Sequence, residues 1–330
     1  MAYERERSAA VDAVVKASRL CRAVQDRLVA GSTLQKGDKS PVTVADYGAQ
    51  AVVGHLLALE FPDTPMVGEE DASALRDPDN LALRQKVMDL TRTVLPDISD
   101  DEVLRAIDHG IYGGGPRGTH WCLDPIDGTK GFLRLEQYAV ALALIEDGEV
   151  VLGVLGCPNL PHDPARPDGG KGCIFVATKG EGAWWRTLDH DGHQRLHVSD
   201  LADPSRGRLT ESVESGHTAQ DESARVAELL RLGGAPVRMD SQAKYAVLAA
   251  GDGEVLVRLL SPSRPDYREK IWDQAAGSLV LEEAGGRITD LSGRPLDFSA
   301  GRSLTGNRGV LATNGPIHAA ALAALEQIGA

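Results

Sequence analysis

The segment that most constrains this chain is Trp121-Cys-Leu-Asp-Pro-Ile-Asp-Gly-Thr-Lys-Gly-Phe-Leu-Arg134. An apolar run at its start predicts the end of a buried strand, and two carboxylates, Asp124 and Asp127, follow directly. Gly128-Thr129 then predicts a turn into a helix. Open α/β sheets place their chemistry at the ends of strands. The segment therefore predicts an α/β type of sheet with a functional site at the end of this strand.

The residue types in this segment indicate a site for a hard metal ion. Two carboxylates at one strand end repel each other unless a cation lies between them, and oxygen ligands select Mg²⁺, Mn²⁺ or Ca²⁺. The fixed φ of Pro125 helps to aim the carboxylates and the Ile126 carbonyl at one point. The backbone amides of Gly128 and Thr129 are expected to hold an anion near the helix start. Taken alone, the segment also fits an ordinary turn that binds nothing, because Asp, Pro and Gly are common in turns.

The composition narrows the classes of partner. The 330 residues are enough for a large core in one domain or two. The net charge of −13 argues against a nucleic-acid-binding surface, so an anionic substrate would need metal ions to offset the acidic site. No signal-like apolar core follows residues 1–7, and no run approaches the roughly 20 apolar residues of a membrane span. We therefore expect a cytoplasmic protein without a membrane partner.

The first part of the chain predicts helices around a polar loop. Apolar positions at helical spacing predict a long amphipathic helix over residues 4–30. Residues 36–46 predict a polar loop leading into a short β segment, with Asp46 at its end and an Ala-rich helix over residues 47–59. Asp46 is then either the N-cap of that helix or a residue of the site.

A second short apolar strand followed by carboxylates is predicted at Met66-Val-Gly-Glu-Glu-Asp71. Taken alone, this segment also fits a solvated acidic turn. Residues 72–109 are expected to be mostly helical.

The four cysteines are scattered without the paired spacing of a zinc site, and we expect Cys122 and Cys157 to be buried thiols.

A β-hairpin is predicted over residues 138–157, with Asp147-Gly148 at its turn. Both strands are continuously apolar, so we expect helices to cover both faces of their sheet. The loop over residues 158–170 is rich in Pro, Gly and Asp and is the predicted domain boundary. It divides the chain into an N-terminal α+β domain, 1–158, and a C-terminal α/β domain, 159–330.

The second half carries cationic residues and one further carboxylate of interest. Ser241 and Lys244 lie three positions apart in a segment that runs from strand into helix, so they are expected to project from one helix face. Arg258 lies on a predicted strand. Asp273 starts a predicted helix that stops at Gly285-Gly286, and it either compensates the helix dipole or binds a metal.

Five separated motifs together resemble one family. Their order and spacing are similar to those of the lithium-sensitive, Mg²⁺-dependent phosphatases of the inositol monophosphatase superfamily, from about residue 8 to about residue 315. Several of them resemble the 3′(2′),5′-bisphosphate nucleotidase branch of that superfamily. The motifs are Lys39-Ser-Pro-Val-Thr-Val-Ala-Asp46, Gly68-Glu-Glu-Asp71, Asp124-Pro-Ile-Asp-Gly-Thr129, Asp240-Ser-Gln-Ala-Lys-Tyr245, and Trp272-Asp273 with Glu283-Ala-Gly-Gly286.

The resemblance implies a fold and a reaction. The fold is a layered α-β-α-β-α sandwich of the sugar-phosphatase type, in the α+β or α/β class. The reaction is hydrolysis of the 3′-phosphate of 3′-phosphoadenosine 5′-phosphate to AMP, by a metal-activated water and without a covalent intermediate. An inositol phosphate or 3′-phosphoadenosine 5′-phosphosulfate remains an alternative substrate. A metal-binding regulatory protein and a two-metal exonuclease are further alternatives, although the exonuclease would need a basic groove.

The resemblance also assigns roles to individual residues. About two or three Mg²⁺ ions are implied, with Mn²⁺ as an alternative, and Glu70 is left open as a direct ligand. Asp46 and Thr129 would orient the water and accept its proton. The partner is a small nucleotide, and the protein is expected to be a monomer or a homodimer. The implied metal ligands are Glu69, Asp124, Ile126 (carbonyl), Asp127 and Asp273; the phosphate-binding amides are Gly128 and Thr129; the nucleotide-facing residues are His217, Ser241, Lys244 and Arg258.

Overall fold

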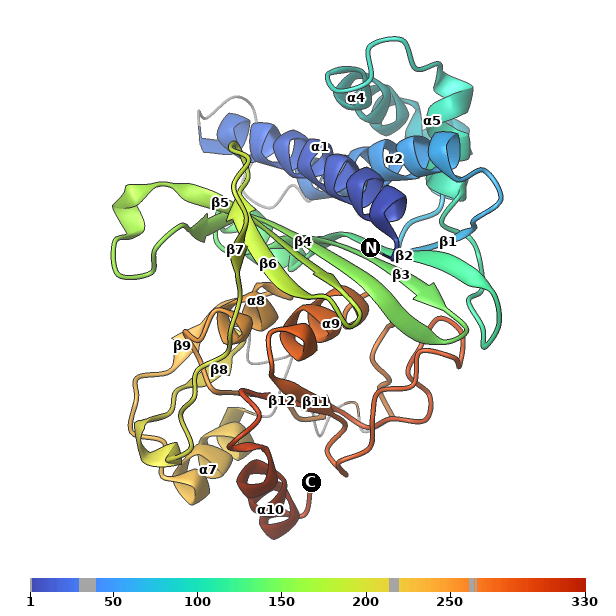
Figure 1. The fold of residues 1–330 in the computed structure, drawn as a ribbon. Helices are drawn as coiled ribbons and strands as arrows, with labels where there is room; N and C mark the ends of the chain where they lie inside the picture. Colours follow the sequence, from blue (N-terminus) through green and yellow to red (C-terminus); the bar gives the residue numbers. More distant parts are fainter. Residues whose placement is uncertain (1, 30–39, 214–219, 261–263, 265) are drawn as a thin grey trace.

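The computed structural model describes residues 2–29, 40–213, 220–260, 264 and 266–330. Its elements form alternating layers of helices and sheets, which lie one below the other in Figure 1. From the top these are the α1–α2 helices, a seven-stranded sheet, the α8–α9 helices, a five-stranded sheet, and the α7–α10 helices. The layered α-β-α-β-α sandwich expected from the motifs is therefore confirmed.

The upper helical layer consists of two long helices, α1 (Glu4–Val29) and α2 (Ser40–Glu60), which pack on each other and on the first sheet. The long amphipathic helix is confirmed. The short β segment expected before Asp46 is wrong, because α2 already begins at Ser40 and Asp46 lies inside it. Asp46 is therefore not a helix N-cap. The region expected to be mostly helical is divided into α3 (Ser73–Arg76), η1 (Pro78–Asn80), α4 (Leu81–Arg92) and α5 (Asp100–Asp108).

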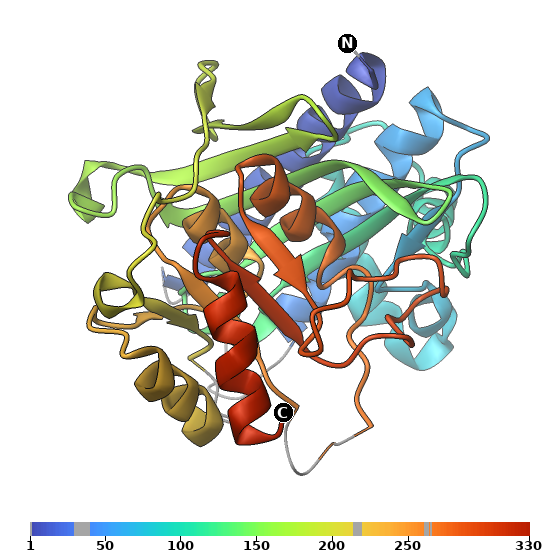
Figure 2. The ribbon, with the colours of Figure 1, turned by 60° about the horizontal axis from the view of Figure 1, so that its bottom comes forward.

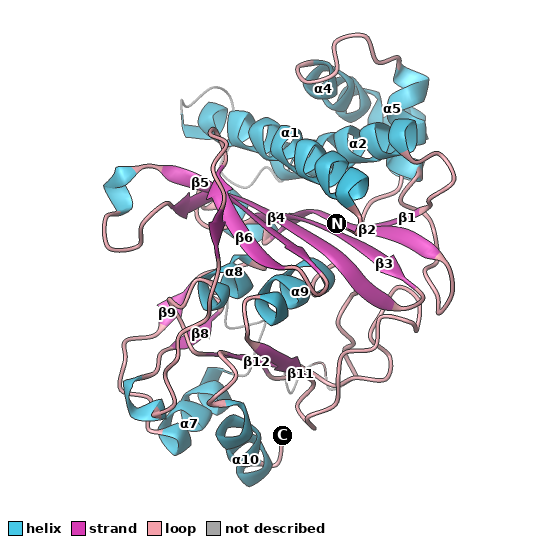
Figure 3. Cartoon of the chain, in the orientation of Figure 1, coloured by secondary structure: helices cyan, strands magenta, loops and turns pink. Residues whose placement is uncertain are grey.

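The first sheet has the order β1-β2-β3-β4-β5-β6-β7, and only β1 and β2 pair in parallel. The predicted hairpin is confirmed, and its turn residues Asp147 and Gly148 have φ values of 49° and 81°, as a tight two-residue turn requires. Helices cover both faces of this sheet, as expected (Figure 3). The strands are β1 (Met66–Gly68), β2 (Thr119–Asp127), β3 (Ala139–Glu146), β4 (Glu149–Pro161), β5 (Lys171–Thr178), β6 (Gly182–Thr187) and β7 (Gln194–Arg195).

The predicted division between residues 1–158 and 159–330 falls inside β4, which continues to Pro161. Strands β5 to β7 then pair onward from β4 in the same sheet. A boundary at residue 158 would therefore separate strands of one sheet. All strands of the second sheet lie at or after Leu209. The division into two domains stays a prediction.

The middle helices α8 (Ala243–Ala249) and α9 (Ala275–Glu283) lie between the two sheets. They approach each other closely, because a Cβ on Gly277 would come within 2.3 Å of the Tyr245 ring. The helix expected to start at residue 271 begins only at Ala275, so Asp273 lies in the preceding turn.

The second sheet has the order β11-β12-β10-β8-β9. Helices α7 (Gln220–Leu230) and α10 (His318–Ile328) pack together on its outer side, where α10 runs across the front of Figure 2. Its strands are β8 (Leu209–Glu211), β9 (Val237–Arg238), β10 (Val255–Arg258), β11 (Arg287–Thr289) and β12 (Val310–Thr313). The remaining short helices are α6 (Thr129–Leu133), η2 (Pro167–Gly169) and η3 (Pro204–Arg206).

Two further observations bear on the sequence predictions. Within the described residues, none of the helices combines the length and apolar character that crossing a membrane requires. Cys122 and Cys157 are buried free thiols, as expected.

Candidate active site

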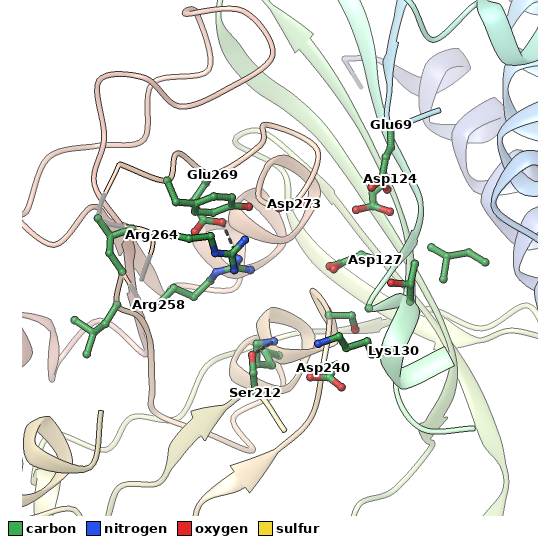
Figure 4. A pocket seen from close by; sticks show the side chains of 18 residues that line it. Glu69, Asp124, Asp127, Lys130, Ser212, Asp240, Arg258, Arg264, Glu269 and Asp273 are labelled. Carbon is green, nitrogen blue, oxygen red and sulfur yellow. Dashed lines mark hydrogen bonds and ion pairs between the residues drawn. The ribbon is translucent and has the colours of Figure 1, made fainter. Parts of the chain in front are cut away.

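A cavity of about 420 Å³ lies where the first sheet, the middle helices and the second sheet meet. Figure 4 shows Glu69 and Asp124 on one side of it, and Arg258 and Arg264, together with Glu269, on the other. The acidic wall comes from the ends of β1 and β2 and the turn before α9, and the basic wall comes from α8 and the end of β10. The cavity therefore combines a group of carboxylates with a group of cationic side chains.

Strand pairing explains why Glu69 and Asp124 lie together. Gly68 of β1 is the direct partner of Leu123 in the parallel β2, so the next residue of each strand emerges at the same sheet edge. Beyond Asp124 the register of β2 with β3 shifts before pairing resumes at Asp127. Pro125 lies in this interruption, where a residue without an N–H group cannot continue the ladder. Both carboxylates of the Asp-Pro-Ile-Asp segment thereby line one cavity.

The acidic side chains interact strongly. Burial, followed by the charges of Glu70 and Asp127, raises the pKa of Glu69 to about 7. Burial, followed by Asp127, raises the pKa of Asp273 to about 8. Burial, followed by Glu69, also holds the pKa of Asp124 well above its ordinary value. Mutual repulsion of this kind is expected where several carboxylates share one site, and a cation among them would favour their charged forms.

The residues fit a hard divalent cation. Glu69, Asp124, Asp127, Asp273 and the Ile126 segment all line the cavity. Asp124 Oδ1 is buried and accepts no hydrogen bond from the described residues, and a buried carboxylate oxygen without a donor is costly unless a cation is its partner. No three His, Cys, Asp or Glu side chains in the described ranges already form a complete ligand cluster.

Asp46 and Glu70 lie away from the cavity lining. Asp46 is 5% exposed, and burial, followed by the charge of Glu69, holds its pKa well above the ordinary value. One of its oxygens, Oδ1, has no hydrogen-bond partner among the described residues. Glu70 is held through its backbone by Gln50, whose side chain donates to the Glu70 carbonyl at 2.6 Å. Glu69, rather than Glu70, faces the cavity.

The predicted phosphate-binding residues Gly128 and Thr129 lie in the turn after β2. Gly128 has a φ of 87°, which favours glycine, and a Cβ there would lie 3.0 Å from the Ser241 Cβ. Thr129 begins the short helix α6, and both residues line the cavity. The structure thus brings the phosphate-binding candidates beside the carboxylates, while their role stays a prediction.

The basic wall is built around Lys244 on α8. Its ammonium donates to Ser212 Oγ at 3.3 Å and to the Met239 carbonyl at 3.4 Å. Burial, followed by the charge of Arg258, lowers the Lys244 pKa to about 8. Ser241 precedes α8 and has a φ of 71°, so the expectation that it shares a helix face with Lys244 is wrong. Both side chains nevertheless line the cavity.

Arg258 is held by residues that had no predicted role. Its guanidinium forms a 2.9 Å ion pair with Glu269, which also accepts a 2.8 Å hydrogen bond from Gln274 Nε2. Other cavity-lining residues without a predicted role are Lys130, Ser212, Asp240, Arg264 and Tyr267. The predicted substrate residue His217 lies outside the described residues.

Gln242 connects the acidic wall to α9. Its backbone N–H donates to Asp127 Oδ2 at 2.5 Å. Its side chain donates to the Trp272 carbonyl at 2.8 Å and accepts from the Gly277 N–H at 2.9 Å. Gln242 belongs to the Asp-Ser-Gln-Ala-Lys-Tyr motif, and this membership was the sequence feature that could have indicated a role for it. Its contact partners could not be predicted, because they are distant from it in the sequence.

Residues 3–330 match the model of the inositol monophosphatase family. A 3′(2′),5′-bisphosphate nucleotidase of Schizosaccharomyces pombe is 42% identical over 329 residues, covering 94% of this chain and 92% of the relative. One of Oryza sativa is 45% identical over 328 residues, covering 94% and 91%. Among solved structures, an inositol monophosphatase from Anabaena (Nostoc) sp. PCC 7120 matches with a TM-score of 0.62 at 22% identity, covering 99% of this chain and 97% of that one.

Proposed function

The chain belongs to the inositol monophosphatase family, and on that basis we propose that it is a Mg²⁺-dependent phosphatase that hydrolyses the 3′-phosphate of 3′-phosphoadenosine 5′-phosphate to AMP and phosphate. The observation that carries this proposal is the division of one cavity into a carboxylate wall and a wall with Lys244 and Arg258. A substrate with two phosphates needs both walls. The names of the relatives at 42% and 45% identity support the same substrate.

The carboxylate wall would hold the metal ions. Glu69, Asp124, Asp127 and Asp273, with the Ile126 carbonyl, offer only oxygen donors, which suits Mg²⁺ or Mn²⁺. About two or three such ions, when bound, neutralise charge on the phosphate and lower the pKa of water. These carboxylates would also set where the 3′-phosphate lies in the cavity.

Asp46 and Thr129 would carry out the proton chemistry. Thr129 begins α6 and lines the cavity, and its hydroxyl would orient an attacking water. Asp46 would accept the proton of that water, and its burial beside Glu69 makes its carboxylate more basic than an exposed one. The amides of Gly128 and Thr129 would hold the phosphate during attack. No side chain needs to form a covalent bond to phosphorus.

The basic wall would select the nucleotide. A charged Lys244 attracts the 5′-phosphate, and the planar guanidinium of Arg258 can bind it through two parallel hydrogen bonds. The ion pair with Glu269 holds Arg258 in place before the substrate arrives. Ser241, which lines the pocket, would contribute to nucleotide binding, and His217 is proposed from the sequence alone to do the same. We place the reaction in the cytoplasm and expect a monomer or a homodimer.

A substrate panel tests the proposal. The purified protein is assayed with Mg²⁺ on 3′-phosphoadenosine 5′-phosphate, the corresponding phosphosulfate and an inositol phosphate, with EDTA as the control. We expect the highest kcat/KM on the bisphosphate and no turnover in EDTA. Hydrolysis of an inositol phosphate at least about tenfold more efficiently, a difference of about 1.4 kcal/mol in transition-state binding, would contradict the proposed substrate. Full activity in EDTA would contradict the metal requirement.

A further inference from the structure

Arg302 lies outside the motifs of the site, yet it contacts the backbone that carries Glu69. Its guanidinium donates to the carbonyl of Gly68, the residue directly before Glu69. It also donates to the carbonyls of Gly110 and Tyr112 at 3.1 Å and 3.0 Å. The Gly68 N–H in turn donates to the Gly110 carbonyl at 2.8 Å. One side chain therefore ties the end of β1 to the loop that precedes β2.

The same guanidinium contacts the segment that carries Asp273. Its carbon atom lies 4.8 Å from the centre of the Trp272 ring, the residue directly before Asp273. The backbone around Arg302 also pairs with this segment, because Lys270 and Ser303 form an antiparallel bridge and the Ile271 N–H donates to the Arg302 carbonyl at 3.3 Å. Arg302 thus touches the neighbours of two carboxylates that come from adjacent layers of the fold, the first sheet and the middle helices.

The chemistry of these contacts suits arginine in particular. Three carbonyl oxygens converge on one planar group that has five N–H donors, and its face remains available for the indole ring. A lysine at this position would keep the charge but could not bond the three carbonyls in the same plane. The backbone positions of Glu69 and Asp273 therefore depend on the shape of the guanidinium as well as on its charge.

We propose that Arg302 is a positioning residue for the metal site, which fixes the separation of Glu69 from Asp273 so that their carboxylates can close on the same divalent cations. This inference rests on the proposed metal-dependent function. Residues that orient metal ligands from behind typically change metal affinity by about 10- to 100-fold when substituted. We therefore expect metal affinity, rather than nucleotide binding, to report the role of Arg302.

The test compares Arg302→Lys and Arg302→Met with the wild-type protein by isothermal titration with MgCl₂ and MnCl₂. Arg92→Met is a matched control, because Arg92 also donates to a backbone carbonyl, that of Ile98 at 3.2 Å, but it pairs with Asp100 at the junction of α4 and α5. We expect Arg302→Met to weaken metal binding about 10- to 100-fold and Arg302→Lys to weaken it less. Arg92→Met should leave the affinity unchanged.

A second readout separates positioning from general loss of structure. At saturating Mg²⁺ the KM for the bisphosphate should stay within about twofold of the wild-type value in Arg302→Lys, while the Mg²⁺ concentration for half-maximal activity rises. Unchanged metal affinity in a folded Arg302→Lys variant would overturn the inference. If Arg302→Met does not fold, the metal affinity of Arg302→Lys alone tests the inference. Failure of the wild-type protein to bind either ion would instead overturn the proposed metal site itself.

Discussion

The backbone N–H of Gln242 donates a 2.5 Å hydrogen bond to Asp127 Oδ2, and this bond joins the start of α8 to the end of β2. The Gln242 side chain is 1% exposed and continues the connection to Trp272 and Gly277. The orientation of Asp127 thus depends on a residue more than a hundred positions away in the chain. The acidic wall is assembled by such connections between layers.

We expect Gln242→Ala to lower both stability and activity. The substitution leaves the Trp272 carbonyl and the Gly277 N–H without their buried partner, and each unsatisfied group costs about 1–3 kcal/mol. Urea unfolding measures this loss. Gln85→Ala is the control, because the Gln85 side chain donates to Asp89 on the exposed side of α4. An equal loss of stability in the two variants would contradict the role of Gln242.

Asp124→Asn and Asp273→Asn should each lower kcat/KM for the bisphosphate at least about 1,000-fold, which is about 4 kcal/mol of transition-state stabilisation. Each substitution preserves size but removes a charge that the metal site requires. Steady-state assays at saturating Mg²⁺ measure the effect, with the exposed Asp101→Asn as the control. Retention of wild-type turnover by either variant would show that its carboxylate is not a metal ligand.

Lys244→Ala should raise KM for the bisphosphate about 10- to 100-fold, the value of one charge-assisted hydrogen bond. A substrate with a 3′-phosphate but no 5′-phosphate should be affected far less, because it lacks the group that Lys244 is proposed to bind. Kinetics on the two substrates give the comparison, and Lys179→Ala, which removes an exposed ion pair with Glu149, is the control. Equal effects on both substrates would argue against the 5′-phosphate contact.

The pH dependence of nucleotide capture should follow Lys244. Its pKa is lowered to about 8, first by burial, so the ammonium is charged below that pH and neutral above it. We expect kcat/KM for the bisphosphate to fall as pH rises through about 8, because this ratio reports ionisations of the free enzyme. Lys244→Arg stays charged above this pH, so this variant should not show the fall in kcat/KM near pH 8. An unchanged profile in that variant would assign the ionisation to another group.

Local patterns predicted the elements of this fold well where hydrophobic period and turn residues agreed, as in α1 and the hairpin around Asp147-Gly148. They failed before Asp46, where the β-branched residues of Pro41-Val-Thr-Val44 suggested a strand although Pro is also compatible with the first turn of a helix. Packing of α2 against α1 and β2 outweighs that local preference.

The cavity itself was less predictable than its motifs. The carboxylates could be found because each follows a short apolar strand or lies just before a helix. The contacts of Gln242 and Arg302 could not, since each joins segments that are distant in the sequence, and no local pattern records such pairings. The composition of residues 158–170 likewise predicted a loop. It did not indicate that β4 and β5, on either side of this loop, belong to the same sheet.

Residues at the two ends of the cavity come from different sheets, and this separation has an evolutionary consequence. Glu69 and Asp124 depend on the pairing of β1 with β2, whereas Arg258 lies at the end of β10 in the other sheet. We therefore expect mutations in β10 or the neighbouring loops to alter which phosphorylated molecule is accepted. The carboxylates at the ends of β1 and β2 can stay unchanged. A fold arranged in this way can acquire new substrates and keep the same reaction.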